Sequence, residues 1–528
     1  MIAAAGIGRD LHLICTTMNF LRILPLLALL ITGSAFGQAS KTKLKARVST
    51  YSDVADDLVP VSTVTVGSSI IILKDRAPGL DEKGIAKAIP KLELYDGQKL
   101  SHVRSTVPSE KYLKQPVMLE QLVEFAGSPF LIASLRKLDK GSISVMGTKV
   151  DPNLTKPSEP YEDLVVFETG YNGASFEPMN SSSDEFEAKV STKTGHLLIT
   201  SPVLRTAGRS AFLMASMDKS RKVQWQHVVE LDAAISAAEI AGSELDADGN
   251  AWLLVRQQYK DRKAGQIQEE MKLFHVSAEG VRGIRFGLDR DAYVKSAVLK
   301  RSADGSMRIA GLHSSTAEGW KADQFFTVPV PTTVDDLKEP NIITTSLGIP
   351  ATRLEVRDLL RSANGNDLLI VEEYEFAEIA HHKTLKKSWK HVHGPVYVFA
   401  LDKSGNERWN STFRRSVHSD HSVLGMPMAA VFENELSLFL VDSEKQNAMR
   451  GDDSKPLSHL DVKDPYSVQV TFDDAGKFRS RNILGSGLDA TLIAGEHLKP
   501  FGANKYLAYG TRTMDGKGYL PVDLEFSK

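Results

Sequence analysis

Cysteine is nearly absent from this 528-residue chain: the only one, Cys15, lies close to its start. If the first residues are removed on export, as argued below, the remaining chain contains none. Disulfides, thiol nucleophiles and cysteine metal sites are then excluded. An exported protein of this size must be held together by packing alone. A closed ring of sheets achieves this without exposed sheet edges.

An excess of one charge is also missing, because 64 Lys and Arg balance 66 Asp and Glu to a formal net charge of -2. A general nucleic-acid-binding protein normally carries a basic excess, so we expect no nucleic-acid partner. Beyond residue 36, no apolar run approaches the roughly 20 residues of a membrane-spanning helix. We therefore expect no integral membrane segment in the mature chain.

One long apolar run does occur, near the start of the chain. The stretch Asn19–Phe36 has one positive charge, then apolar residues, then small residues around Ala35. This order is typical of a signal peptide, and we expect cleavage before Gln38. Residues 1–37 are therefore assigned to a signal peptide, with Met18 as an alternative start and an uncleaved anchor as the alternative interpretation. The predicted location is the periplasm or the exterior of the cell.

A hairpin pattern of strand, polar turn and strand returns along the rest of the chain, its turns 54 to 70 residues apart. Repeats of this size indicate a solenoid or a propeller. The marker turns lie near Gly127, Gly195, Gly249, Gly305, Gly365, Asn434 and Asn504. A second hairpin type falls between the markers, with turns near Ser220, Gly280, Gly405 and Gly476.

Each marker hairpin and its partner make four strands, which is one blade of a β-propeller. We predict an all-β fold, a single β-propeller of about seven four-stranded blades, with six or eight as alternatives and tandem β-sandwich domains as the rival. The propeller is assigned to residues 68–528 and an N-terminal extension to residues 38–67. We expect Ser69–Leu73 or Lys91–Thr106 to complete the last blade and so join the two ends of the chain.

Two stretches resemble known propeller repeats. Ala400–Trp409 resembles the repeat of quinoprotein-type propellers, in which the tryptophan packs between blades. Glu372–Asn447 is similar to uncharacterised secreted propellers of Bacteroidota-type bacteria, which carry a Glu-x-Tyr strand, a His at a strand entry, an Asp-x-x-Gly turn with Trp and a later Asp. The matching residues are Glu372, Tyr374, His393, Asp402–Trp409 and Asp442. The resemblance implies a fold and an export route, and no activity or quinone.

Structural roles are expected for Trp225, Trp409 and Gly405. Trp409 follows the Gly405 turn by four residues on a strand with apolar neighbours, where a large ring fills the gap between two sheets. The glycine provides the turn of the hairpin.

Histidines gather in one region, where six of the 14 lie within 41 residues. The candidate ligand or metal residues are His381, His382, His391, His393, His418, Asp420 and His421. In a blade, the connection between strands two and three opens on the same face as the connection to the next blade, so we expect these residues on a single face. Imidazole and carboxylate suit a divalent transition metal, the one cofactor considered. Interleaved lysines favour an anion or a glycan instead, and a solvated loop is the third interpretation.

Two functions remain open, and no catalytic residue is assigned. The first is a non-catalytic binding or scaffold protein of the bacterial envelope or exterior, a monomer with a protein or glycan ligand. The second is a channel- or metal-centred hydrolase or lyase acting on polysaccharide. Four or more charged or tyrosine side chains converging from the innermost strands at the channel would favour the enzyme, and scattered charge would favour the binder.

Overall fold

In the computed structural model, residues Leu44–Phe526 form one compact unit. It contains every strand in full except for Lys43, the first residue of the first strand, and Ser527, the last residue of the last strand. The residues that the structure describes are 42–49, 58–76, 89–137, 141–168, 177–178, 186–191, 193–206, 209–232, 235–260, 267–286, 293–302, 305–316, 321–331, 343–348, 353–380, 387–450, 457–458, 464–486, 490–512 and 518–528.

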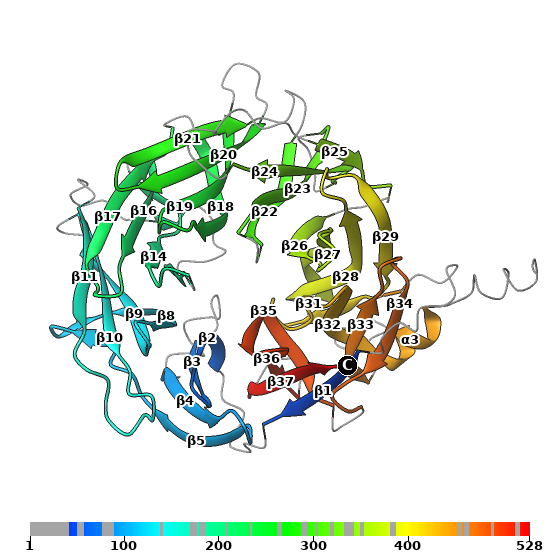
Figure 1. The fold of residues 1–528 in the computed structure, drawn as a ribbon, viewed down its shortest axis with the longest axis horizontal. Helices are drawn as coiled ribbons and strands as arrows, with labels where there is room; N and C mark the ends of the chain where they lie inside the picture. Colours follow the sequence, from blue (N-terminus) through cyan, green and yellow to red (C-terminus); the bar gives the residue numbers. More distant parts are fainter. Residues whose placement is uncertain are drawn as a thin grey trace, which may run out of the picture. The chain divides into compact units, whose positions relative to one another are not determined.

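The unit is a β-propeller of eight blades, each a four-stranded antiparallel meander (Figure 1). Its first four blades, with their strands in order from the channel outward, are blade 1, β2 (Leu58–Val66), β3 (Ser69–Arg76), β4 (Lys91–Asp96) and β5 (Ser101–Thr106); blade 2, β8 (Met118–Phe125), β9 (Ser128–Lys137), β10 (Ser142–Lys149) and β11 (Glu162–Glu168); blade 3, β13 (Glu187–Val190), β14 (Leu197–Thr200), β16 (Arg209–Met217) and β17 (Val223–Glu230); and blade 4, β18 (Ile235–Leu245), β19 (Ala251–Lys260), β20 (Ile267–Ser277) and β21 (Gly280–Phe286).

The chain continues round the ring in the same way. The remaining blades are blade 5, β22 (Tyr293–Arg301), β23 (Met307–Ser314), β24 (Gln324–Val330) and β25 (Ile343–Ser346); blade 6, β26 (Leu354–Arg361), β27 (Asp367–Ala380), β28 (Lys387–Leu401) and β29 (Glu407–Phe413); blade 7, β31 (Met428–Phe432), β32 (Glu435–Ser443), β33 (Pro465–Phe472) and β34 (Phe478–Asn482); and blade 8, β35 (Leu492–Gly502), β36 (Lys505–Thr511), β37 (Leu520–Ser527) and β1 (Lys43–Val48). Smaller elements are β6 (Lys111–Tyr112), β7 (Gln115–Pro116), β12 (Glu177–Pro178), β15 (Leu204–Thr206), β30 (Val417–Ser419) and helix α3 (Glu444–Met449).

The core consists of the faces between blades. Eight hydrophobic clusters each join the sheets of two neighbouring blades, including one of Ile70, Ile72 and Tyr95 from blade 1 with Leu507 from blade 8. Each sheet therefore buries its apolar faces only against its neighbours, as expected for a repeat architecture. In the described part of the chain, no helix is long and apolar enough to cross a membrane.

The predicted fold class is confirmed, with eight blades as the number. All seven marker turns fall between the first and second strands of a blade, in blades 2 to 8. The eighth marker, missed in the sequence, is the turn at Gly67 in blade 1, whose φ is +58°. The propeller was assigned to residues 68–528, but two of its strands lie before residue 68: β1 and β2 each belong to a four-stranded sheet.

The predicted closing strand was wrong. Ser69–Leu73 lies in the second strand of blade 1 and Lys91–Thr106 covers its third and fourth strands, whereas β1 forms the outer edge of blade 8 by pairing with β37. Arg47 in β1 fixes this closure, because its guanidinium binds the carboxylate of buried Asp523 and donates to the Gln98 carbonyl over 2.7 Å. In the sequence, this strand falls within residues 38–67, which were assigned to an N-terminal extension.

We predict that the ring is one cooperative unit. A fragment of residues 188–420 contains most of blades 3 to 6 and exposes an apolar sheet face at each cut, so we expect it to aggregate. Size-exclusion chromatography and thermal melting of this fragment would test the prediction. A soluble monomer with a sharp melting transition would instead indicate separable domains.

Candidate functional site

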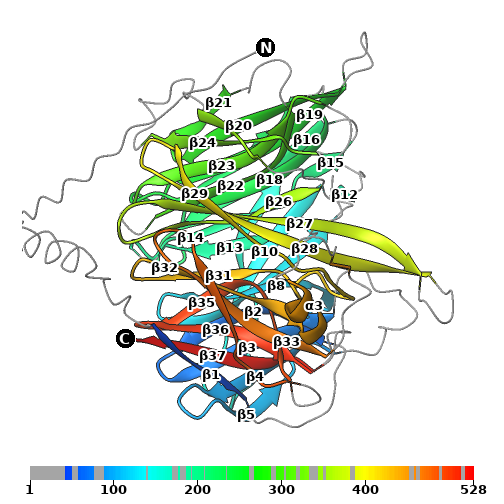
Figure 2. The same ribbon diagram turned by 90° about the vertical axis from the view of Figure 1, so that its right-hand side faces the viewer.

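Blade 6 carries a hairpin longer than its own sheet. Pairing of β26 with β27 stops at Glu373, and β29 pairs with β28 only from Val396 onward. Beyond these points β27 and β28 continue as a two-stranded ribbon, in which Tyr374–Ala380 pairs with Lys387–His393. Figure 2 shows the β27–β28 hairpin extending past the other strands. The short strand β30 pairs with His391–His393 of β28, at the end of the ribbon that joins the blade.

One face of this ribbon carries a row of rings that we call the aromatic stripe: Trp389, Phe376, His391, Tyr374 and His393. Cross-strand pairing places Phe376 opposite His391 and Tyr374 opposite His393. The Phe376 ring stacks on Trp389 at 5.3 Å between centroids and lies 4.7 Å from His391. Exposure falls along the stripe, from 59% at Trp389 and 49% at Phe376 to zero at His393. The stripe therefore runs from solvent into the blade.

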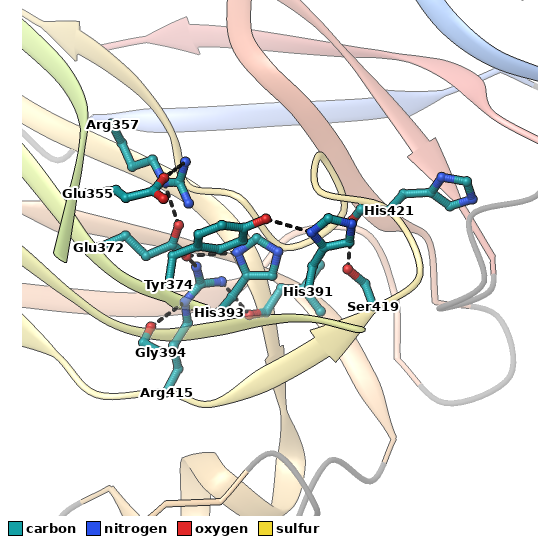
Figure 3. Close-up of polar contacts among 11 residues, drawn as sticks. Glu355, Arg357, Glu372, Tyr374, His391, His393, Gly394, Arg415, Ser419 and His421 are labelled. Carbon is teal, nitrogen blue, oxygen red and sulfur yellow. Dashed lines mark hydrogen bonds and ion pairs between the residues drawn. The ribbon is translucent and has the colours of Figure 1, made fainter. Parts of the chain in front are cut away.

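The inner end of the stripe meets a buried ion cluster centred on Glu372 (Figure 3). One carboxylate oxygen, Oε1, accepts from His393 Nδ1 at 3.0 Å and from Arg415 Nη2 at 2.5 Å. The other oxygen, Oε2, accepts from Arg357 Nε at 2.6 Å. Glu372, His393 and Arg415 are fully buried, so each partner compensates a charge that water cannot reach.

The two arginines connect this cluster to its surroundings. Arg415 also donates to the carbonyls of Gly394 at 3.2 Å and Val441 at 3.1 Å, which fixes it between blades 6 and 7. Arg357 pairs with Glu355 at 2.8 Å, and its guanidinium lies 4.5 Å from the centre of the Tyr374 ring. The cluster thus fixes the position of the tyrosine ring.

These contacts determine the protonation states. Burial opposes ionisation of Glu372, but Arg357, His393 and Arg415 together lower its pKa to about 2. The carboxylate therefore accepts, and His393 Nδ1 carries the proton. Burial lowers the pKa of His391 to about 4 and raises that of Tyr374 to about 12. Both groups are neutral near pH 7.

Tyr374 and His391 form a hydrogen-bonded pair, with 2.6 Å between the phenol oxygen and Nδ1. The phenol donates this hydrogen bond when the single imidazole proton lies on Nε2, and Nδ1 donates it when the proton lies there. A neutral imidazole next to a phenol can accept a proton at one atom and release one at another, which is the requirement for general acid–base chemistry.

The predicted histidine group is divided by the strand geometry. His391 and His393 share the stripe face, while His418 in β30 lies opposite Val392 and therefore on the other face of the ribbon. The Asp420 carboxylate forms an ion pair with Lys390, and the ring centroids of His421 and Tyr519 are 6.3 Å apart. The two remaining candidates, His381 and His382, lie outside the described residues.

A metal was one interpretation of these histidines. Among the residues that the structure describes, no group of three or more His, Cys, Asp or Glu side chains is placed to hold a metal ion. Of the described candidates, His393 binds Glu372, and His391 binds Tyr374.

The opposite face of the ribbon forms a cleft of about 300 Å³. Its walls include Glu373, Glu375, Val392 and Arg353, and Arg353 pairs with Glu375. Adjacent carboxylates of one strand thus lie on different faces, Glu372 inside the ion cluster and Glu373 in the cleft.

Inner strands of other blades also bring charges to the channel. Glu239 in β18 pairs with Arg256 in β19 at 2.7 Å, and both act electrostatically on Glu355 in β26. Burial raises the pKa of Glu355. Of the four groups Glu239, Arg256, Glu355 and Arg357, three lie on innermost strands, and Arg256 lies on the second strand of blade 4.

The residues expected to be structural lie at blade interfaces and turns. Trp225 is 7% exposed, in the core between blades 3 and 4. The Trp409 ring packs against the core of blades 6 and 7 and stacks on Phe472 at 6.5 Å. Gly405 has a φ of +85° in its turn, and its N–H donates to the Asp402 carbonyl.

We predict that Trp409→Ala lowers the free energy of unfolding by about 3 kcal/mol, the lower end of the range for a large aromatic because part of the ring stays exposed. Denaturant unfolding would measure this, with Trp389→Ala as the control, since that ring lies outside the blade cores. An unchanged midpoint combined with lost ligand binding would assign Trp409 to a binding site.

The sequence did not single out several residues of this site. Arg357 and Arg415 lie 15 and 43 residues from Glu372, at no motif spacing. Phe376 and Trp389 did carry a signal, since each lies two residues from the next ring of the stripe, in an otherwise polar hairpin.

Comparisons with known proteins reveal only remote similarity. No family model matches the chain, and no curated protein matches it. Solved structures that it resembles include a protein of unknown function from Dyadobacter fermentans (12% identity, TM-score 0.32, covering 80% of this chain and 96% of that one). Others are a polysaccharide lyase of the ulvan lyase family PL25 (9%, 0.38, 81% and 93%) and the β-propeller domain of the Trilobed protease from Pyrococcus furiosus (8%, 0.36, 82% and 97%). At these similarities, they tell us nothing about this chain's substrate.

Proposed function

We propose that this propeller binds a saccharide chain along the aromatic stripe of the β27–β28 hairpin. The observation that carries the proposal is the stacked pair of Phe376 and Trp389, which are 49% and 59% exposed on one face. Large apolar rings left in solvent mark interaction sites. Flat rings suit the apolar faces of sugar rings, and the hydrogen-bonding groups of Tyr374 and His391 follow directly along the stripe.

Binding to a panel of soluble polysaccharides, both acidic and neutral, tests this proposal. Affinity electrophoresis should show retardation by at least one of them. Trp389→Ala and Phe376→Ala should each abolish most of it, because stacking platforms contribute strongly through few residues. Leu113→Ala is the matched control, since Leu113 is 77% exposed and lies away from the stripe. Equal retardation of all four proteins would contradict the proposal.

Cleavage of the bound chain is the second candidate function, favoured by the Tyr374–His391 pair. Hydrolysis by two carboxylates would need a free acid, but Glu355 and Glu372 are both paired with Arg357. Elimination instead needs a base to take the C5 proton of a uronate and an acid to protonate the departing C4 oxygen, and it consumes no water. The tyrosine and the histidine can provide these two groups.

Ultraviolet absorbance of an unsaturated sugar product would detect this elimination. Wild-type protein should generate it from a uronic-acid polysaccharide, and Tyr374→Phe should not, although it keeps the ring of the stripe. Retained saccharide binding without any product in the wild type would leave the protein a non-catalytic binder.

We further infer that the chain is exported, with cleavage before Gln38, and belongs with the secreted bacterial propellers that it resembles. The support is that Glu372, Tyr374 and His393, which carry the resemblance, meet in one cluster, and that Asp442 acts electrostatically on Arg415 there. Intact mass of the protein from its native host would test the cleavage. A mass that includes residues 19–36 would contradict it.

A further inference from the structure

The connection from blade 1 to blade 2 carries a small hairpin, formed by β6 and β7. These strands pair through two residues each, which leaves Leu113 and Lys114 as a two-residue turn. Both residues have a left-handed backbone, with φ of +48° and +69°. Such a turn normally takes Asn and Gly, because larger side chains are strained there. Strain that is kept at one position suggests a function for the residue that causes it.

The leucine of this turn points into solvent. Leu113 is 77% exposed, the largest fraction of any large apolar residue that the structure describes. Four others of the same segment, Ile89, Val103, Val107 and Met118, are 41% to 58% exposed. Five of the nine large apolar residues exposed in the described chain therefore lie between residues 89 and 118, and apolar side chains gathered in solvent mark an interaction site.

Blade 2 holds the base of the hairpin. The Tyr112 hydroxyl donates to Asp163 Oδ2 of β11 at 3.1 Å, and the Tyr161 hydroxyl donates to the Ser109 carbonyl at 2.8 Å. The tip is therefore presented on an ordered support, and a partner that binds it does not have to order the loop first.

Positive charge surrounds the leucine. Lys111 and Lys114 flank it, and neither forms an ion pair within the part of the chain that the structure describes. Residues 89–118 contain five Lys and Arg and three Asp and Glu, and one of these acids, Glu93, is buried in an ion pair. Two acids, Glu110 and Asp163, lie at the base of the hairpin, where Asp163 already accepts from its tyrosine. The tip itself is apolar and cationic.

The small size of the tip favours a lipid surface over a protein partner. A stable protein interface buries roughly 800 Å² on each partner, from about 20–30 residues, which is more than a two-residue turn and its neighbours provide. A bilayer needs less, because single apolar side chains enter the boundary between headgroups and acyl chains while lysine ammonium groups stay at the lipid phosphates. A leucine between two lysines has this arrangement.

We propose that the β6–β7 hairpin docks the protein on a bilayer surface with anionic headgroups, with Leu113 in the apolar boundary and Lys111 and Lys114 at the phosphates. The contact is peripheral and reversible, because a few apolar side chains bind far more weakly than a spanning helix. It does not depend on the proposed saccharide binding, because it uses none of the aromatic stripe. Leu113 remains a control for that binding, because the soluble polysaccharides contain no lipid.

Co-sedimentation of residues 38–528 with lipid vesicles at low ionic strength tests the docking. The protein should sediment with vesicles of phosphatidylglycerol and phosphatidylethanolamine, and much less with phosphatidylcholine vesicles. Leu113→Asn and the double variant Lys111→Gln/Lys114→Gln should each weaken the partition into anionic vesicles about tenfold or more, through lost apolar burial and lost attraction to the headgroups. Val281→Asn is the matched control, since it makes the same kind of change at an exposed residue of blade 4.

Thermal melting separates docking from folding. Leu113→Asn should melt no lower than the wild type, because asparagine adopts a left-handed backbone more readily than leucine. Weaker partition together with an unchanged or higher melting temperature then assigns Leu113 to the docking surface. If Leu113→Asn unfolds, the lysine variant decides the test.

Absence of sedimentation with anionic vesicles would overturn the proposal and leave a protein as the partner of the tip. Equal partition of the wild type and Leu113→Asn would also overturn it, as would equal partition into anionic and neutral vesicles. Because the vesicles carry no saccharide, the Phe376→Ala/Trp389→Ala variant should sediment like the wild type. Its loss from the vesicle pellet would show that the aromatic stripe contacts the lipid in place of the hairpin.

Discussion

Glu372→Ala is expected to lower the free energy of unfolding by roughly 3–5 kcal/mol, the usual cost of removing one partner from a buried ion pair. The loss would leave Arg415 fully buried without its carboxylate and would free Arg357 from one of its two acids. Denaturant unfolding would measure the effect. Glu378→Ala is the control, because Glu378 is exposed on the same strand.

The pH dependence gives this prediction a second readout. The pKa of Glu372 is lowered to about 2 in the folded protein, against about 4.3 for an unperturbed glutamate. The unfolded state therefore binds the proton first as the pH falls. The stabilisation by Glu372 is complete above the unfolded pKa and is lost between about pH 4 and pH 2. Glu372→Gln should lack this component, and an identical pH profile in both proteins would contradict the buried cluster.

The second large effect is expected from removing the closing strand. A chain that starts at residue 50 lacks β1, so β37 becomes an open edge, and Asp523, which is 1% exposed in the full chain, loses its partner Arg47. Leu44, Ala46 and Val48 would also leave the core between blades 7 and 8. We expect a loss on the order of 5 kcal/mol, which equals the whole stability of many domains.

A synthetic peptide of residues 42–49 provides the control for this truncation. If β1 acts by pairing, the peptide should restore the melting temperature of the truncated chain, and an Arg47→Ala peptide should restore less of it. A truncated chain that melts like the full chain would show that the ring does not depend on this strand.

The repeat could be predicted from the sequence because turn chemistry is local. The residues at seven turns sit where the chain needs a left-handed or tight conformation, as at Gly127 and Gly365, with φ of +73° and +85°. The closing strand could not be found this way. Its partner β37 lies at the other end of the chain, and nothing local marks their pairing.

The site was predicted in part, for a similar reason. Clustering in sequence pointed to His391 and His393, and strand alternation puts both on one face. Their partners come from elsewhere: Arg357 from the inner strand and Arg415 from the connection to the next blade. Only the fold brings a cation from each side to Glu372. The sequence therefore left a metal site, an anion or glycan site and a solvated loop open, and it did not indicate the neutral Tyr–His pair above buried ions.

The most direct test of the central claim, that the aromatic stripe binds a saccharide, is saturation-transfer NMR with oligosaccharides from polygalacturonate, alginate, arabinan and xylan. In the wild type, sugar ring protons of at least one of them should receive saturation from the protein. The Phe376→Ala/Trp389→Ala double variant, with an unchanged melting temperature, should show no transfer. Transfer of equal strength in the double variant would contradict the claim and place the saccharide elsewhere on the propeller.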